Sequence, residues 1–165
     1  MKTTNIEARY LKAKEQTTKL LASLDFAHGQ PKVLGLNGWV LEQVVRECIE
    51  RELKKAKISC NISEQQSIGS GKAKVDLVVG SAALEVKVSG VYDSSSKESK
   101  YVGYKKKIQK KGWEYFYITL YETYEPNIKA AKSVFGRQRF FILSEAGEWK
   151  RFSKELIRCL KKNKK

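Results

Sequence analysis

The strongest structural signal in the chain lies in residues 75–88, which read Val75-Asp76-Leu77-Val78-Val79-Gly80-Ser81-Ala82-Ala83-Leu84-Glu85-Val86-Lys87-Val88. Two runs rich in β-branched residues flank the Gly80-Ser81 pair, and such residues favour strands. Gly-Ser is a favourable two-residue hairpin turn. The stretch therefore predicts an antiparallel hairpin in which Val79 faces Ala82 and Asp76 faces Glu85.

This register gathers charged groups on one face of the hairpin. Side chains alternate along a strand, so Glu85 and Lys87 share a face, and the pairing adds Asp76 to it. Two carboxylates that face each other are destabilising. A divalent cation would offset that repulsion, and Mg²⁺ prefers carboxylate and water oxygens. A four-residue loop would instead pair Asp76 with Lys87 as a plain salt bridge, and this second register remains open.

Residue periodicity predicts the elements around the hairpin. Helices are expected at residues 5–27, 38–57, 97–111, 128–135 and 152–161, and strands at 57–64, 113–121 and 139–143. This order predicts an α/β fold, a mixed central sheet flanked by helices. The chain has 165 residues, enough for one domain with a single core, which we place at residues 1–160 before a basic tail at 161–165.

The helix expected at residues 38–57 carries an acid on its apolar side. At about 100° per residue, the helix aligns an apolar arc that consists of Leu41, Val45, Cys48, Ile49 and Leu53. Glu42 falls inside this arc, near Ile49. An inward-facing carboxylate needs a partner or a function. Glu52 also falls in the arc, where the helix would emerge from the core.

Composition narrows the classes of function. The chain has 33 Lys and Arg against 18 Asp and Glu, a net charge of +15 that favours nucleic acid or an acidic membrane as partner. His28 is the only histidine, which excludes nuclease or protease chemistry that needs two. Cys48, Cys60 and Cys159 are widely spaced, as in a reducing cytoplasm. Because no apolar run could span a bilayer and the N-terminus lacks an apolar signal core, we expect a cytoplasmic protein without a membrane partner.

Two basic segments are candidates for contacts with nucleic acid. The first lies on the helix expected at residues 97–111 and consists of Lys105, Lys106, Lys107, Lys110 and Lys111. These lysines would clamp phosphates without reading sequence, although a solvated helix face is the alternative. The second segment is Arg137-Gln138-Arg139, whose side chains are of the types that read guanine and adenine edges.

The hairpin motif resembles that of the PD-(D/E)xK nuclease superfamily, which has the restriction-endonuclease-like fold. The resemblance is carried by Val75-Asp76, Leu84-Glu85-Val86-Lys87 and Gly38-Trp39-Val40-Leu41-Glu42. The order of elements is similar to the family core over about residues 38–121, which leaves 122–160 as a C-terminal elaboration. Val75 stands where the motif has proline. The helix expected at 97–111 has no Gln-x-x-x-Tyr signature, which argues against the exonuclease and helicase-linked branch.

The resemblance implies a Mg²⁺-dependent endonuclease, with Mn²⁺ as a substitute. Asp76 and Glu85 would bind the metal with help from the Val86 carbonyl. Lys87 would orient or activate the attacking water and stabilise charge on the phosphate. Glu42 would hold a metal-bound water or a second ion, which makes it the fourth catalytic residue.

The substrate implied is double-stranded DNA. We favour a small type II restriction enzyme, because the segment after Tyr121 would supply base contacts or a dimer surface. An enzyme that cuts both strands is naturally a two-fold homodimer. The alternatives are a structure-specific nuclease, such as a Holliday-junction resolvase, and a non-catalytic DNA-binding protein of the same fold.

Overall fold

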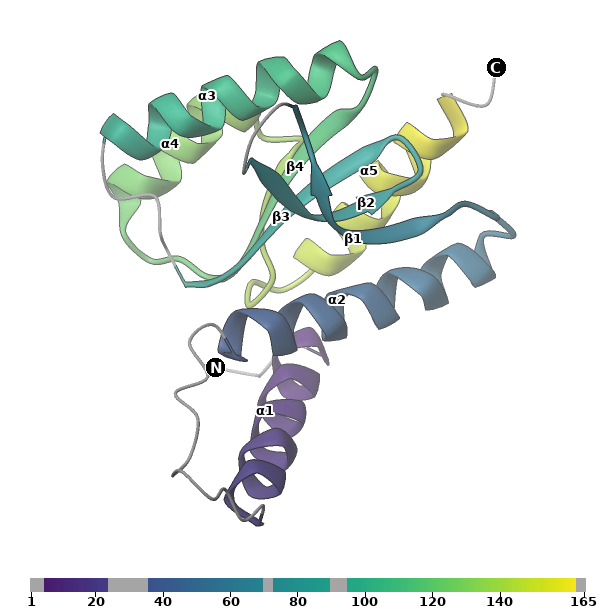
Figure 1. Ribbon diagram of the computed structural model, residues 1–165, viewed down its shortest axis with the longest axis vertical. Helices are drawn as coiled ribbons and strands as arrows, with labels where there is room; N and C mark the ends of the chain where they lie inside the picture. Colours follow the sequence, from purple (N-terminus) through teal and green to yellow (C-terminus); the bar gives the residue numbers. More distant parts are fainter. Residues whose placement is uncertain (1–4, 24–35, 70–72, 90–94, 163–165) are drawn as a thin grey trace.

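The computed structural model describes residues 5–23, 36–69, 73–89 and 95–162, and it places a five-stranded mixed sheet between two groups of helices (Figure 1). The elements in chain order are α1 (Asn5–Ser23), α2 (Leu36–Lys55), β1 (Ile62–Ser67), β2 (Lys74–Val79), β3 (Ala82–Ser89), α3 (Ser95–Lys110), β4 (Glu114–Tyr121), α4 (Glu125–Phe135), β5 (Phe140–Ile142) and α5 (Glu148–Lys162). The expected α/β class is confirmed.

The strands lie in the order in which they occur in the chain, β1-β2-β3-β4-β5. The first three are joined by tight turns and pair antiparallel, whereas β3, β4 and β5 pair parallel. Parallel neighbours need a crossover, and α3 and α4 supply the two crossovers. The sheet is therefore antiparallel on the side of β1 and parallel on the side of β5.

The two faces of the sheet bury separate apolar clusters. One cluster joins β3 and β4 to α1, α2 and α5, and includes Leu84, Phe116 and Phe152. The other joins the opposite face to α3 and α4, and includes Tyr101 and Ile128. The apolar arc predicted for the second helix is confirmed, since all five of its residues are buried, namely Leu41, Val45, Cys48, Ile49 and Leu53.

The hairpin has the two-residue turn that the sequence favours. The paired residues are Val79 with Ala82, Val78 with Ala83, and Leu77 with Leu84. Gly80 has φ of 55°, which glycine adopts without steric cost. A Cβ atom at Gly80 would also lie 2.9 Å from Leu160 Cδ2 of α5. The turn thus needs glycine for its backbone angle and for its close packing.

Most element boundaries fall within a few residues of those expected, and β1 is the exception. The strand expected at residues 57–64 begins only at Ile62, because the chain leaves α2 through a turn in which Lys57 has φ of 54°. β1 then continues to Ser67, three residues beyond the end expected for this strand. Within the described ranges, no helix combines the length and apolarity that a membrane span requires.

Candidate active site

Two carboxylates and one ammonium group meet between β2 and β3. Lys87 Nζ lies 2.9 Å from Asp76 Oδ2 and 2.8 Å from Glu85 Oε1. The side chains of Lys87, Asp76 and Glu85 are 24%, 13% and 4% exposed. The three residues predicted to form the catalytic centre are therefore in direct contact, and we call them the Asp76–Glu85–Lys87 cluster.

Asp76 belongs to neither of the two backbone pairings of β2. The pairing of β1 with β2 includes Glu64–Leu77 and Gln66–Val75 but skips Asp76, and the pairing of β2 with β3 ends at Leu77. In place of a backbone acceptor, Asp76 Oδ2 accepts a hydrogen bond of 2.7 Å from the Val86 N–H. The N–H and C=O of one residue in an extended strand point to the same edge, so the Val86 carbonyl also faces Asp76.

The sequence left two registers open, and the structure combines features of both. The backbone has the register of the two-residue turn. The Asp76–Lys87 ion pair, which the sequence predicts for a four-residue loop, is present as well. It forms because a lysine side chain is long enough to reach the neighbouring strand diagonally, as cross-strand neighbours can.

Glu85 is the most buried charged group of the cluster. Lys87 binds its Oε1, and the Tyr115 hydroxyl of β4 donates a hydrogen bond of 3.3 Å to its Oε2. Burial raises the pKa of Glu85, Lys87 lowers it and Asp76 raises it, with a net increase. Sequence reasoning did not identify Tyr115 as a partner of Glu85, because no spacing along the chain connects the two residues.

Lys87 stays protonated in this setting. Burial lowers its pKa, but the carboxylates of Glu85 and Asp76 outweigh burial, and the pKa lies above its usual range. The cluster therefore carries one fixed positive charge between two acids. A buried acid that lacks such a partner would favour its neutral form.

Glu42 of α2 joins this site from the other side. Burial, followed by repulsion from Asp76, raises the pKa of Glu42 to about 7. Gln65 Nε2 of β1 lies 3.4 Å from Glu42 Oε2. Glu42 is half-buried, and the charges of Asp76 and Lys87 both act on its pKa, which places it near the cluster.

Gln65 was not a predicted site residue. Its φ is 50°, a left-handed conformation that is uncommon outside glycine. It occupies the position between the pairs Glu64–Leu77 and Gln66–Val75, where the ladder to β2 is interrupted beside Asp76. Unusual backbone angles cluster at functional sites. No sequence signal marks such an angle in a glutamine.

The oxygens of the cluster fit a hard divalent cation. Asp76 Oδ2 and Glu85 Oε1 already converge on one cationic atom, Lys87 Nζ. Mg²⁺ is commonly held by one or two carboxylates and retains several waters. Within residues 5–23, 36–69, 73–89 and 95–162, no three Asp, Glu, His or Cys side chains form a ready metal site. Additional ligands would therefore be the Val86 carbonyl or water, with Glu42 acting through water.

The five lysines of residues 105–111, which were predicted to contact phosphates, differ in their exposure. Lys105 is partly buried and donates a hydrogen bond of 2.6 Å to the Val134 carbonyl. The other four are exposed on the surface, namely Lys106, Lys107, Lys110 and Lys111. Lys111 Nζ lies 4.9 Å from the centre of the Trp113 ring. Four of the five lysines are thus accessible to a polyanion.

Arg137 and Arg139 lie away from the cluster. Arg139 Nε is 3.2 Å from Glu114 Oε2, and Glu114 pairs with Ala82 at the start of β3. Lys87 pairs with Thr119, five residues further along β4, a separation of about 16 Å at 3.3 Å per residue. Arg137 is exposed and lines a hollow together with Lys105 and Arg139.

No family model matches this chain, and no curated protein or solved structure matches it either. Function is therefore inferred from the geometry of the Asp76–Glu85–Lys87 cluster and its neighbours.

Proposed function

We propose that this protein is a divalent-metal-dependent endonuclease that hydrolyses double-stranded DNA, with Mg²⁺ as its cofactor. One observation carries the proposal: a carboxylate oxygen of Asp76 and one of Glu85 lie within 2.9 Å of the same Lys87 nitrogen. This arrangement would hold a hard cation beside a fixed positive charge. The net charge of +15 suits a polyanionic substrate.

Hydrolysis of a phosphodiester needs a nucleophile from water and groups that stabilise developing negative charge. A bound divalent cation would lower the pKa of its water and stabilise that charge. Asp76 and Glu85 would hold the cation. The ammonium group of Lys87 remains protonated at neutral pH and would stabilise charge on the phosphate oxygens.

Glu42 is suited to accept the proton of the attacking water. Its pKa is raised to about 7, the range in which a general base works best at neutral pH. The water oxygen would bond to phosphorus as its proton passes to the Glu42 carboxylate. The bond from phosphorus to one sugar oxygen would break, and that oxygen would keep the electron pair and take a proton from a second water. Gln65 would orient the same carboxylate through its 3.4 Å contact.

The fold arrangement supports membership of the PD-(D/E)xK superfamily. Asp76 and the Glu85-Val86-Lys87 triplet lie on adjacent antiparallel strands, and the next strand is parallel and follows a helix. Glu42 approaches from a helix that precedes the sheet. The proposal therefore includes a restriction-endonuclease-like fold, although it depends on the site and not on the fold alone.

The proposal is broader than a type II restriction enzyme for a structural reason. That narrower assignment relied on the segment after Tyr121 for base contacts or a dimer surface, with Arg137, Gln138 and Arg139 as candidate readers of DNA bases. Arg139 contacts Glu114 and Glu155, and the Gln138 side chain accepts a hydrogen bond from Arg158. Both side chains are thus engaged within the protein. The restriction enzyme, the junction resolvase and the homodimer remain separate predictions.

Cleavage assays on defined substrates test the proposal. Supercoiled plasmid, linear duplex and a four-way junction are incubated with Mg²⁺, with Mn²⁺ and with a chelator. We expect metal-dependent cleavage that is lost in Glu85→Gln and retained in Glu47→Gln, an exposed acid of α2 that serves as the matched control. Discrete fragments would indicate a restriction enzyme, and selective junction cleavage a resolvase. Tight DNA binding without cleavage in either metal would contradict the proposal.

A further inference from the structure

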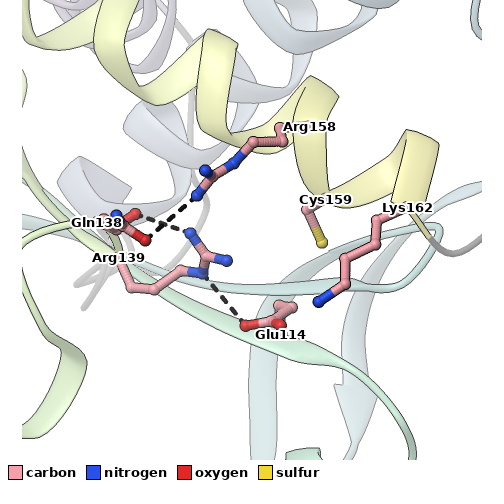
Figure 2. A pocket seen from close by; sticks show the side chains of 6 residues that line it. All are labelled: Glu114, Gln138, Arg139, Arg158, Cys159 and Lys162. Atoms are coloured by element: carbon pink, nitrogen blue, oxygen red, sulfur yellow. Dashed lines mark hydrogen bonds and ion pairs between the residues drawn. The ribbon is translucent and has the colours of Figure 1, made fainter.

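A basic hollow lies at the start of β4. Lys87 of β3 pairs with Thr119, near the other end of β4. Its lining residues are Glu114, Gln138, Arg139, Arg158, Cys159 and Lys162, and its volume is about 290 Å³ (Figure 2). A second hollow of about 390 Å³ shares Glu114, Gln138 and Arg139 with it. The second hollow adds Lys105, Gln109 and Arg137, among others. We call the two together the basic groove.

Positive charge dominates the lining of the basic groove. Its cationic residues are Lys105, Arg137, Arg139, Arg158 and Lys162. The same lining contains one carboxylate, Glu114. Glu155 lies next to it and pairs with Arg139 and Arg158. Even with Glu155 included, five cations face two anions, so the surface attracts anions.

Arg139 is held in a fixed orientation at the junction of the two hollows. Its guanidinium contacts Glu114 and Glu155, each at 3.2 Å, and donates to the Gln138 carbonyl at 3.1 Å. It also lies 4.7 Å from the centre of the Phe116 ring. An arginine that is already ordered loses little entropy when it binds a ligand. Its side chain is still 18% exposed, so part of the group remains accessible.

The outer cations are accessible. Arg158 is 57% exposed, bonds to Glu155 at 2.6 Å and donates to Gln138 Oε1 at 3.2 Å. Lys162 and Arg137 are exposed as well. Figure 2 shows Arg158 and Lys162 extending from α5 toward Gln138 and Glu114. The groove is thus formed by α3, β4, α5 and the segment before β5, which are far apart in the sequence.

We propose that the basic groove binds the phosphodiester backbone of nucleic acid, at phosphates other than the one that would lie in the Asp76–Glu85–Lys87 cluster. The cations line two adjoining hollows and do not converge on a single point, which suits an extended polyanion better than one small anion. Arginine side chains match the geometry of phosphate oxygens.

This inference does not depend on cleavage. It concerns affinity, and it can hold for a protein that binds nucleic acid without hydrolysing it. Binding is therefore measured with the full chain carrying Asp76→Asn, so that substrate stays intact. A protein that binds through the groove but never cuts DNA would leave the inference standing and remove the proposed function.

Two matched triple variants provide the test. The groove variant carries Arg137→Gln, Arg158→Gln and Lys162→Gln. The control carries Lys12→Gln, Lys14→Gln and Lys19→Gln on the exposed surface of α1, which projects away from the sheet (Figure 1). Each set removes three positive charges, so a general charge effect is equal in both. Melting temperatures establish whether both variants are folded. If the groove variant is unfolded, a double variant with Arg137→Gln and Lys162→Gln replaces it. The matching control is then the double variant with Lys12→Gln and Lys14→Gln.

Affinity for a random-sequence duplex is measured by fluorescence anisotropy across a range of salt concentrations. Each lost phosphate contact lowers the steepness of log K against log salt by about 0.9, so the groove triple should flatten the slope by about 2–3. The control should keep the slope of the parent protein. Equal slopes in the two triple variants, or a parent slope in the groove variant, would overturn the inference.

Discussion

Replacement of Lys87 by alanine should destabilise the fold, because it leaves two acids without their shared cation. Lys87 Nζ is 2.8 Å from Glu85 and 2.9 Å from Asp76, whose side chains are only 4% and 13% exposed. Loss of one partner from a buried ion pair costs about 3–5 kcal/mol, whereas exposed pairs contribute about 0–1 kcal/mol. Since Lys87 is 24% exposed, we expect the low end of the buried range, about 3 kcal/mol.

The loss should depend on pH in a defined direction. Burial raises the pKa of Glu85 and Lys87 lowers it, so removal of Lys87 raises the pKa further. A group with a raised pKa in the folded state stabilises the fold below its unfolded pKa, and this contribution disappears as pH rises through the folded pKa. Protonated Glu85 needs no cation. The deficit of the variant should therefore be largest at pH values above the folded pKa of Glu85 and should shrink as pH falls through that pKa.

Thermal unfolding measures this effect. For a domain of this size, about 3 kcal/mol corresponds to a decrease in melting temperature of about 6–12 °C. Lys87→Met, which keeps most of the side-chain length without charge, should show the same loss. Lys106→Ala, at an exposed position of α3, should show none. If the melting temperature of Lys87→Ala equals that of Lys106→Ala across the whole pH range, the two acids do not need Lys87 and the ion-pair account is wrong.

Mg²⁺ extends the same experiment to the proposed cofactor. A divalent cation bound by Asp76 and Glu85 would replace the missing positive charge, so Mg²⁺ should raise the melting temperature of Lys87→Ala more than that of wild type. Cleavage by the variant should still fall by the equivalent of about 2.7–4 kcal/mol, as when a preorganised electrostatic donor is removed. Restored stability without restored cleavage would separate the structural and catalytic roles of Lys87.

Three further substitutions have distinct expected outcomes. Asp76→Ala should abolish cleavage. In urea unfolding it should lower the free energy of unfolding by about 1–3 kcal/mol, because the Val86 N–H loses its acceptor. Asp76→Asn keeps an acceptor oxygen and should lower it less. Glu42→Gln should stabilise the protein above about pH 7 and have little effect below about pH 4.5, because the pKa of Glu42 is raised to about 7; an equal effect at both pH values would contradict that assignment. Gln65→Gly should remove the strain of a left-handed glutamine, so the melting temperature should stay equal or rise, while the pH profile of cleavage shifts. Gln66→Gly, one residue further along, should lower the free energy of unfolding by about 0.5–1 kcal/mol.

The parts of the fold that follow from local chemistry were predictable. The Gly80-Ser81 turn fixed the register, because a one-residue slip would have turned the apolar face of each strand toward the charged face. The helical period placed Leu41 and Ile49 in the core and Glu42 beside them. The contact among Asp76, Glu85 and Lys87 follows from this register, so the centre of the candidate site was predictable as well.

Features that depend on the paths of distant segments were not predictable from the sequence. Tyr115 reaches Glu85 only because α3 returns the chain parallel to β3. Gln65 adopts its left-handed conformation where the pairing of β1 with β2 is interrupted, and no residue type predicts such an interruption. The basic groove combines Arg158 of α5 with Arg139 and Glu114, and no sequence spacing connects them.

The role of Lys87 shows why a structural and a functional interpretation need not exclude each other. From the sequence, an ion pair between Lys87 and Asp76 is the alternative to a catalytic centre, yet the pair forms within the register that also brings Glu85 into contact with Lys87. When both of these acids are ionised, the fold needs a positive charge between them. A lysine can supply it in the absence of a metal, and it then lies beside the oxygens where a divalent cation would bind. The ion pairs by which Lys87 stabilises the fold would thus also keep its side chain in position for catalysis.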